Sequence, residues 1–351
     1  MNTSAPAPVE FTTSGSLDAA RLAELANGLR VSQALYVAAQ LGIADHLAQQ
    51  SLDARALAVV TGTDPSALRR IMRALCAVGV FAETASGQFA LTSVGQLLRS
   101  DVLSSHRAGV LFMAGPVRWR CWSQLLDAVK TGENRSQSLL GMQLFDYYAA
   151  NLAESKLRDD AMRSFSAAHG AALVATIDIG KARLVVDVGG GTGALLAAIL
   201  TAHPDVRGVL FDLPYVVAHA APVFEAANVA KRCAIEGGSF LERVPEGGDL
   251  YLLKQILHDW DDAEAAAILG RCARAMPRGA RVLVIERRLP DQAKPNSSIE
   301  TFLVDLEMLV MAPGGRERTD AEYRKLFADA GLEHVITVPT ASSLFVFEAR
   351  R

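Results

Sequence analysis

The sequence has few cysteines, no strong excess of one charge and no long apolar run, and each absence excludes a class of protein. The four cysteines, Cys76, Cys121, Cys233 and Cys272, lack paired spacing, which is typical of a reducing cytosol and offers no zinc site. A net charge of -3 gives no broad basic surface for nucleic acid or an anionic membrane. Charged residues, Gly or Pro interrupt every apolar stretch before it is long enough to span a bilayer. Residues 1–16 lack the features of a signal peptide, so we expect a disordered tail and a cytoplasmic protein.

Length and composition indicate a well-buried protein with more than one domain. The chain has 351 residues, of which 50% are hydrophobic and 21% charged. That length exceeds the usual size of one compact core. The predicted organisation is a first domain over residues 17–104, a helical segment over residues 105–176 and an α/β domain over residues 177–351.

The first predicted domain has a winged-helix pattern of helices followed by a hairpin. Ser16 is expected to cap a long helix from Leu17, and Asp64-Pro65 to open a later one. The expected segments are helices over 17–41, 52–60 and 66–78, then strands over 80–84 and 88–92.

Three arginines on the last of these helices, Arg69, Arg70 and Arg73, leave two interpretations of the domain. A winged helix with a basic recognition helix binds DNA, and the chain is then a ligand-sensing regulator. A winged helix with solvated arginines serves packing or dimerisation. We favour the second interpretation and expect no nucleic-acid binding, because the sequence has no basic run and no basic wing tip.

The region from Arg107 to Thr176 is predicted to be helical and rich in bulky side chains. Aromatic and Met residues at helical spacing usually belong to a core, but they also line pockets for flat apolar molecules. Both interpretations stay open for the group.

The second half of the chain alternates strands and helices, which is typical of a doubly wound α/β sheet. The last two predicted strands are close enough in sequence to pair as an antiparallel hairpin. Helices are expected over 263–275 and 320–330. The expected strands are 184–188, 208–212, 232–236, 250–254, 281–287, 334–338 and 343–349.

A glycine-rich turn follows the first of these strands and predicts a nucleotide-like ligand. The run Gly189–Gly193 is tighter than the G-x-G-x-x-G pattern that binds a pyrophosphate. Asp187 before the turn would repel phosphate but suits an ammonium group, and Asp212 at the next strand end suits two ribose hydroxyls. A ligand with a ribose, a cationic centre and no phosphate is S-adenosylmethionine.

A histidine beyond the fourth strand is the candidate general base. His258 lies past the carboxyl end of its strand, where open α/β sheets place their chemistry. A histidine titrates near neutrality and can accept the proton of a phenol. Glu286 ends the next strand, and Glu317 lies in a turn that is expected to fold back to the same edge. A carboxylate at Nδ1 would leave Nε2 free to accept that proton.

At these motifs the chain resembles the small-molecule O-methyltransferases of plants and bacteria, of the caffeate and acetylserotonin methyltransferase type. The resemblance covers nearly the whole chain. It depends on the segments 187–193, 212–214, 253–260 and 313–319, which read DVGGGTG, DLP, LKQILHDW and PGGRERT.

The resemblance implies a Rossmann-like methyltransferase domain with an antiparallel end hairpin and an N-terminal winged-helix dimerisation domain that forms a homodimer. It also implies a base, His258, flanked by Glu286 and Glu317. The helical middle segment supplies the acceptor pocket. The implied cofactor contacts are Asp187, Gly189, Gly191, Asp212, Leu213, Gly238, Ser239, Phe240 and Lys254, and the acceptor contacts are Trp122, Met162, Phe165, Asp259 and Trp260.

One segment departs from that family pattern. The family commonly has Gly-Asp-Met-Phe after the third strand, where the acid and the Met hold the adenine. Here the match is Gly237-Gly238-Ser239-Phe240, so the adenine is expected to be read by the backbone or by Ser239 and stacked on Phe240.

The predicted reaction is methyl transfer from S-adenosylmethionine to a hydroxyl of a small aromatic molecule of secondary metabolism, such as an antibiotic precursor. No metal is expected, because the sequence shows no carboxylate and carbonyl cluster that displaces His258. One alternative is a relative that uses the same scaffold for hydroxylation, decarboxylation or cyclisation, and the other is the ligand-sensing regulator.

Overall fold

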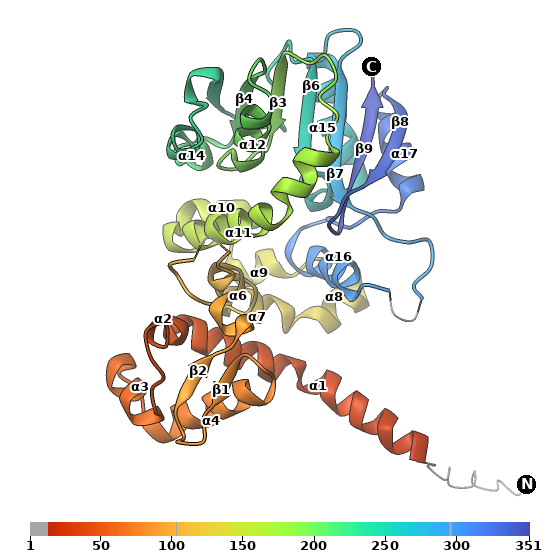
Figure 1. Cartoon of the computed structure of the whole chain (residues 1–351). Coiled ribbons are helices and arrows are strands. Elements are labelled where there is room, and N and C mark those ends of the chain that lie inside the picture. The colour runs from red at the N-terminus through yellow and green to blue at the C-terminus, as the bar shows by residue number, and fades with distance from the viewer. Residues whose placement is uncertain (1–12, 103, 295–296) are drawn as a thin grey trace, which may run out of the picture. The chain divides into compact units, whose positions relative to one another are not determined.

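The computed structural model describes residues 13–102, 104–294 and 297–351, and the chain divides into two compact units, Met1–Gly115 and Pro116–Arg351 (Figure 1). Residues 1–12 of the predicted tail lie outside the described residues. Residues 13–16 are already helical, because helix α1 spans Thr13–Gln40. The expectation that Ser16 caps a helix from Leu17 is therefore wrong.

The first unit has the helix and hairpin order expected of a winged helix. Its short helices begin at side chains that accept hydrogen bonds from the first turn: Asp53 for α3, Asp64 for α4 and Thr92 for α5. Leu57, Met72 and other apolar residues form its core. After α1 the elements are α2 Ile43–His46, α3 Ala54–Thr61, α4 Pro65–Ala77, β1 Phe81–Glu83, β2 Phe89–Leu91, α5 Ser93–Gln96 and α6 Arg107–Met113.

The arginines of α4 are engaged with an acid of the hairpin. Arg69 and Arg73 lie 3.5 Å and 3.4 Å from the carboxylate oxygens of Glu83 on β1. Their charge is thus partly neutralised within the unit, which fits the packing interpretation of these side chains.

The second unit begins with helices, as the sequence predicts for the middle segment. These helices are α7 Pro116–Trp122, α8 Leu125–Thr131, α9 Ser136–Leu140, α10 Leu144–Ala150 and α11 Leu152–Thr176. We call this group, α7 to α11, the helical wall.

A seven-stranded sheet follows the helical wall, in the order β5-β4-β3-β6-β7-β9-β8 (Figure 1). β3 to β7 are parallel, while β9 pairs antiparallel with both β7 and β8. The doubly wound sheet and its end hairpin are confirmed. The strands are β3 Leu184–Val188, β4 Arg207–Asp212, β5 Cys233–Gly237, β6 Leu250–Lys254, β7 Arg281–Arg287, β8 Glu333–Pro339 and β9 Leu344–Arg350.

Helices and short turns connect the strands of this sheet. They are α12 Ala194–Ala202, α13 Pro214–Val217, α14 Ala221–Ala226, α15 Asp262–Ala275, α16 Ile299–Met311 and α17 Asp320–Asp329, with short 3-10 turns η1 Ala230–Arg232 and η2 Leu257–Asp259. None of the helices among the described residues has the length and apolar character needed to cross a bilayer.

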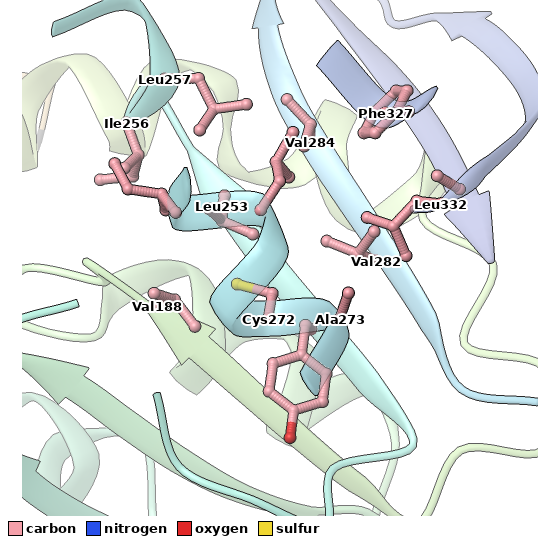
Figure 2. Close-up of a cluster of buried hydrophobic side chains, with 14 of the residues drawn as sticks. Val188, Leu253, Ile256, Leu257, Cys272, Ala273, Val282, Val284, Phe327 and Leu332 are labelled. Carbon is pink, nitrogen blue, oxygen red and sulfur yellow. The ribbon is translucent and has the colours of Figure 1, made fainter. Parts of the chain in front are cut away.

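Alternate residues of the central strands are buried against opposite helices, because side chains alternate between the two faces of a sheet. On β6, Leu253 packs against α15 and α17, whereas Leu252 packs on the α12 side. Figure 2 shows the first of these cores, where Cys272 and Ala273 of α15 lie beside Leu253. The central strands are therefore apolar on both faces, so their ends are rigidly placed.

The helical wall has a small core of its own. Cys121 of α7 is buried with Val310 and Met311 of α16, and Trp122 packs against this cluster. The wall is thus packed against α16 as well as against the sheet domain.

Candidate active site

The turn after β3 has the tight geometry that its glycines permit. Gly189, Gly191 and Gly193 all have positive φ, from 62° to 82°. A Cβ on Gly190 would lie 2.5 Å from an oxygen of Asp187. The turn therefore brings the main chain against the Asp187 carboxylate, just before the N-terminus of α12, and leaves no room for a side chain there.

Asp187 is a buried carboxylate, and one of its two oxygens is unpaired. It is 1% exposed, and Oδ2 has no hydrogen-bond partner among the described residues. Burial raises the pKa of Asp187 to about 7, although Lys254 opposes the shift. An uncompensated carboxylate oxygen at a cavity wall suits a cationic ligand group.

Asp212 is held by the backbone at the end of β4. Its Oδ2 accepts a 2.8 Å hydrogen bond from the Gly191 N–H, and its Oδ1 accepts one of 2.7 Å from the Leu213 N–H. Burial raises its pKa in spite of these donors. The carboxylate is thus fixed beside the glycine turn, with lone pairs left for hydroxyl donors.

A cavity of about 530 Å³ joins the strand ends to the helical wall. Eleven of the residues that line it were predicted from the sequence. The predicted residues that line it are Asp187, Gly189, Gly191, Asp212, Leu213, Ser239, Phe240, Lys254, Met162, Asp259 and Trp260.

Six predicted residues are not among the residues that line this cavity: Gly238, Trp122, Phe165, His258, Glu286 and Glu317. A Cβ on Gly238 would lie 2.7 Å from the Phe211 ring, so this position is closed by packing. The Trp122 indole N–H donates to Glu307 and faces α16. Phe165 is half-buried on α11. Gly238 is thus placed as a backbone element, while Trp122 belongs to the wall core.

His258 lies directly behind the cavity, in the cluster that the sequence predicted. Its Nδ1 is 2.8 Å from Glu317 Oε1 and 3.8 Å from Glu286 Oε2. Its Nε2 is 3.7 Å from Asp259 Oδ1, and Asp259 lines the cavity. The turn with Glu317 does fold back to this edge, since the Arg316 N–H donates to the His258 carbonyl at 2.8 Å.

The carboxylates dominate the electrostatics of this cluster. Burial alone lowers the pKa of His258, but Glu286, Glu317 and Asp259 outweigh it and raise the pKa to about 10. Burial raises the pKa of Glu286 to about 7, against the effect of the nearby imidazole. Protonated imidazole is therefore strongly stabilised here.

A fully buried arginine, 0% exposed, holds the backbone around His258. Arg318 Nη1 donates to the Leu257 carbonyl and Nη2 to the Trp260 carbonyl, both at 2.8 Å. Its Nε donates to Asp262 Oδ1, also at 2.8 Å. One guanidinium thus fixes the chain on both sides of the candidate base.

His258, Glu286 and Glu317 also form a set of ligand atoms within 4.8 Å of one another, which is compatible with a metal ion. Two of these groups are already engaged. Glu317 accepts from His258, and Glu286 Oε1 accepts from the Ile256 and Leu257 N–H groups at 2.9 Å and 2.8 Å. One oxygen of each carboxylate therefore has a protein partner without an ion, whereas Glu286 Oε2 and Glu317 Oε2 have no hydrogen-bond partner among the described residues.

Aromatic rings form one side of the cavity. Phe145 of α10 lies nearly parallel to Trp260, with ring centroids 6.3 Å apart, and Phe240 meets Trp260 edge-on at 5.9 Å. Such a surface binds planar molecules.

Sequence reasoning missed several lining residues, above all Arg158, Asp159 and Tyr215. A signal was present for the first, because Met162 was proposed and Arg158 lies four positions before it on α11. Residues four apart share one face of a helix.

Comparisons with known proteins were made for the whole chain. Residues 122–333 match the O-methyltransferase domain family, and residues 23–101 match the O-methyltransferase dimerisation domain family. A phenazine O-methyltransferase of Lysobacter antibioticus is 38% identical over 94% of this chain and 95% of its own. An 8-amino-8-demethylriboflavin N,N-dimethyltransferase of Streptomyces davaonensis is 33% identical over 95% of both chains.

A solved structure shows the same fold with a ligand. Human N-acetylserotonin methyltransferase, in complex with S-adenosylmethionine, superimposes with a TM-score of 0.86 at 28% identity. The match covers 95% of this chain and 97% of the human one.

Proposed function

Because the chain belongs to the O-methyltransferase family, we propose that it methylates a hydroxyl group of a small aromatic acceptor, with His258 as general base and no metal ion. S-adenosylmethionine is the cofactor, as in the structural relatives. When bound, it supplies a methyl group that is already activated by the sulfonium centre. The protein then has to hold the acceptor in line with that methyl group and remove a proton.

The residues at the carboxyl ends of β3 to β6 fit this cofactor. The unpaired oxygen of Asp187 suits the ammonium group, and Asp212 suits the ribose hydroxyls. Ser239 and Phe240 line the same cavity and suit the adenine. Lys254, which also lines the cavity, is the remaining side chain of the proposed cofactor site. We assign Gly189, Gly191, Leu213 and Gly238 to the backbone frame of this site.

The observation that carries the base assignment is the 2.8 Å contact between His258 Nδ1 and Glu317. A carboxylate at Nδ1 fixes the tautomer with a free Nε2, which lies on the side of Asp259 and the cavity. The same carboxylates stabilise the imidazolium that forms when the acceptor loses its proton. Proton transfer from an acidic phenol is then favourable.

We further propose a metal-independent reaction, because His258 Nδ1 contacts Glu317 Oε1 and Glu286 Oε1 accepts two backbone hydrogen bonds. The N-terminal unit is assigned to homodimerisation through its match to the dimerisation domain family. Residues 17–104 would serve this contact, 105–176 the acceptor and 177–351 the cofactor. A cytoplasmic location and no binding of nucleic acid complete the proposal.

His258→Ala tests this function directly. We expect kcat with a wild-type aromatic acceptor to fall by about 10²–10⁴-fold, the usual contribution of general base catalysis. The affinity for S-adenosylhomocysteine, measured by calorimetry, should stay within about twofold, because His258 is not among the residues proposed to hold the cofactor. Undiminished turnover in the variant would exclude the base role, and loss of wild-type turnover in EDTA would exclude metal independence.

A second candidate function is methylation of an aromatic amine. It is favoured by the N,N-dimethyltransferase at 33% identity. A labelled methyl transfer assay with matched phenol and aniline acceptors separates the two, and only the phenol reaction should depend on His258.

A further inference from the structure

Arg158 is a cavity residue with most of its donors unused. It projects from α11 into the cavity, and its side chain is 26% exposed. Among the described residues its only hydrogen bond goes from Nη1 to the adjacent Asp159, at 3.4 Å. A guanidinium carries five N–H donors. One long hydrogen bond leaves the rest available to a ligand.

Two aromatic rings hold this guanidinium in place. Its carbon Cζ lies 5.5 Å from the ring centroids of both Phe145 and Tyr148. Cation–π contacts of this kind fix the orientation of the group and lower the cost of binding. Phe145 is also parallel to Trp260, so the guanidinium lies at the edge of the aromatic surface that suits a planar molecule.

The carboxylates near Arg158 leave most of its N–H donors without a hydrogen bond. Its positive charge favours the ionised forms of Asp159, Asp212 and Asp259, although burial raises the pKa of all three. Asp212 is bonded to two backbone N–H groups, and Asp259 faces His258. Only Asp159 reaches the guanidinium, through that one long hydrogen bond.

We propose that Arg158 is a specificity residue that binds a carboxylate on the acceptor, and that the acceptor is a planar hydroxylated aromatic acid. This inference rests on the proposed methyl transfer and names its substrate class. The aromatic ring lies on Phe145 and Trp260, the carboxylate pairs with Arg158, and the hydroxyl faces the side of Asp259 and His258. Arginine and carboxylate form paired, charge-assisted hydrogen bonds, which select an acid over a neutral amide.

Arg163 provides a matched control on the same helix. It also lines the cavity, but its side chain is 50% exposed and ion-paired with Asp160. Its charge is thus already compensated, and solvent screens it.

The test measures binding of 6-hydroxy-2-naphthoate and 6-hydroxy-2-naphthamide by calorimetry to the full-length protein loaded with S-adenosylhomocysteine. We expect the wild type to bind the acid at least about tenfold more tightly than the amide. Arg158→Gln should abolish that preference, Arg158→Lys should retain part of it, and Arg163→Gln should leave it unchanged.

Equal affinity of the wild type for acid and amide, or failure to bind either, overturns the inference. So does an Arg158→Gln variant that loses both ligands equally, since that result assigns Arg158 to pocket shape. The affinity of each variant for S-adenosylhomocysteine shows whether the site has folded, and Arg158→Lys remains decisive if Arg158→Gln has not. Methyl transfer to neutral naphthols, measured in parallel, tests the proposed function separately from the carboxylate preference.

Discussion

The base cluster lies behind the cavity, the helical wall lines it, and the two are built in opposite ways. His258, Glu286, Glu317 and Arg318 are 0–7% exposed. His258 bonds to Glu317, and Glu286 and Arg318 bond to the neighbouring backbone, at 2.8–2.9 Å. In the wall, Arg158 is partly exposed and makes one hydrogen bond of 3.4 Å. The proposed base is therefore held rigidly at the sheet edge, while the proposed acceptor contacts come from side chains with freedom to adapt.

This difference suits a family whose relatives act on different acceptors. The proposed base, fixed in place, can serve any methyl-accepting molecule, whereas selectivity requires different contacts for each such molecule. Substitutions at the sheet edge should thus affect stability and rate, and substitutions in the wall should affect which molecule binds.

The largest effect should come from Arg318→Met. Removing this buried guanidinium leaves the Leu257 and Trp260 carbonyls and Asp262 without their donor, which should lower the free energy of unfolding by about 3–5 kcal/mol. Urea unfolding measures the change. The control is Arg316→Met, whose partly exposed ion pairs should contribute less than about 1 kcal/mol. An equal loss of stability in both variants would contradict the proposed role of Arg318 in holding the backbone around His258.

Glu317→Gln should slow the reaction and move its pH profile. We expect the activation free energy to rise by about 2–3 kcal/mol, because the imidazolium loses a charged partner. Since the carboxylates raise the pKa of His258, removing one lowers it, and the rising limb of kcat/KM should shift to lower pH. Rates measured over about pH 6–10 test this. An unshifted limb would show that another group is titrating.

Asp187→Asn should weaken cofactor binding but stabilise the free protein at high pH. The folded pKa of about 7 lies above the ordinary value of 3.8 for this carboxyl group, so the wild type loses stability as pH rises from about 4 to about 7. At about pH 8 the variant should be more stable by about 1–2 kcal/mol, and the difference should vanish near pH 4. Thermal unfolding at both pH values measures it. A pH-independent difference would contradict the titration of Asp187.

Trp122→Phe should have the smallest effect. The indole N–H donates to Glu307, which keeps its ion pair with Arg118 at 2.9 Å. We expect a loss of about 1 kcal/mol in stability and no change in acceptor KM. The paired variant Met162→Ala, at the cavity, should raise KM instead. A raised KM for Trp122→Phe would indicate that Trp122 contacts the acceptor after all.

The sheet and the base cluster could be predicted because their signals are local or topological. The bounds of β3, β6 and β7 follow from apolar runs, and the carboxyl ends of parallel strands meet at one edge. That rule brings Asp187, Asp212 and Glu286 together without knowledge of side-chain contacts.

The wall could not be predicted to the same depth. Helical periodicity identifies a buried face but does not distinguish a core from a cavity, so Trp122 and Met162 looked alike in the sequence. The structure separates them, because Trp122 contacts Glu307 of α16 and Met162 lines the cavity. Such partners lie far apart in the chain, and only the tertiary packing reveals them.

The buried cysteines give each of the two regions its own chemical reporter. Cys121 lies in the core of the helical wall at 1% exposure, and Cys272 lies beneath the sheet at 0%. Burial raises the pKa of both thiols, that of Cys272 to about 12, so neither reacts until its surroundings open. The rates at which a thiol reagent labels the two sites therefore time the opening of the wall and of the sheet separately, in one unmodified chain.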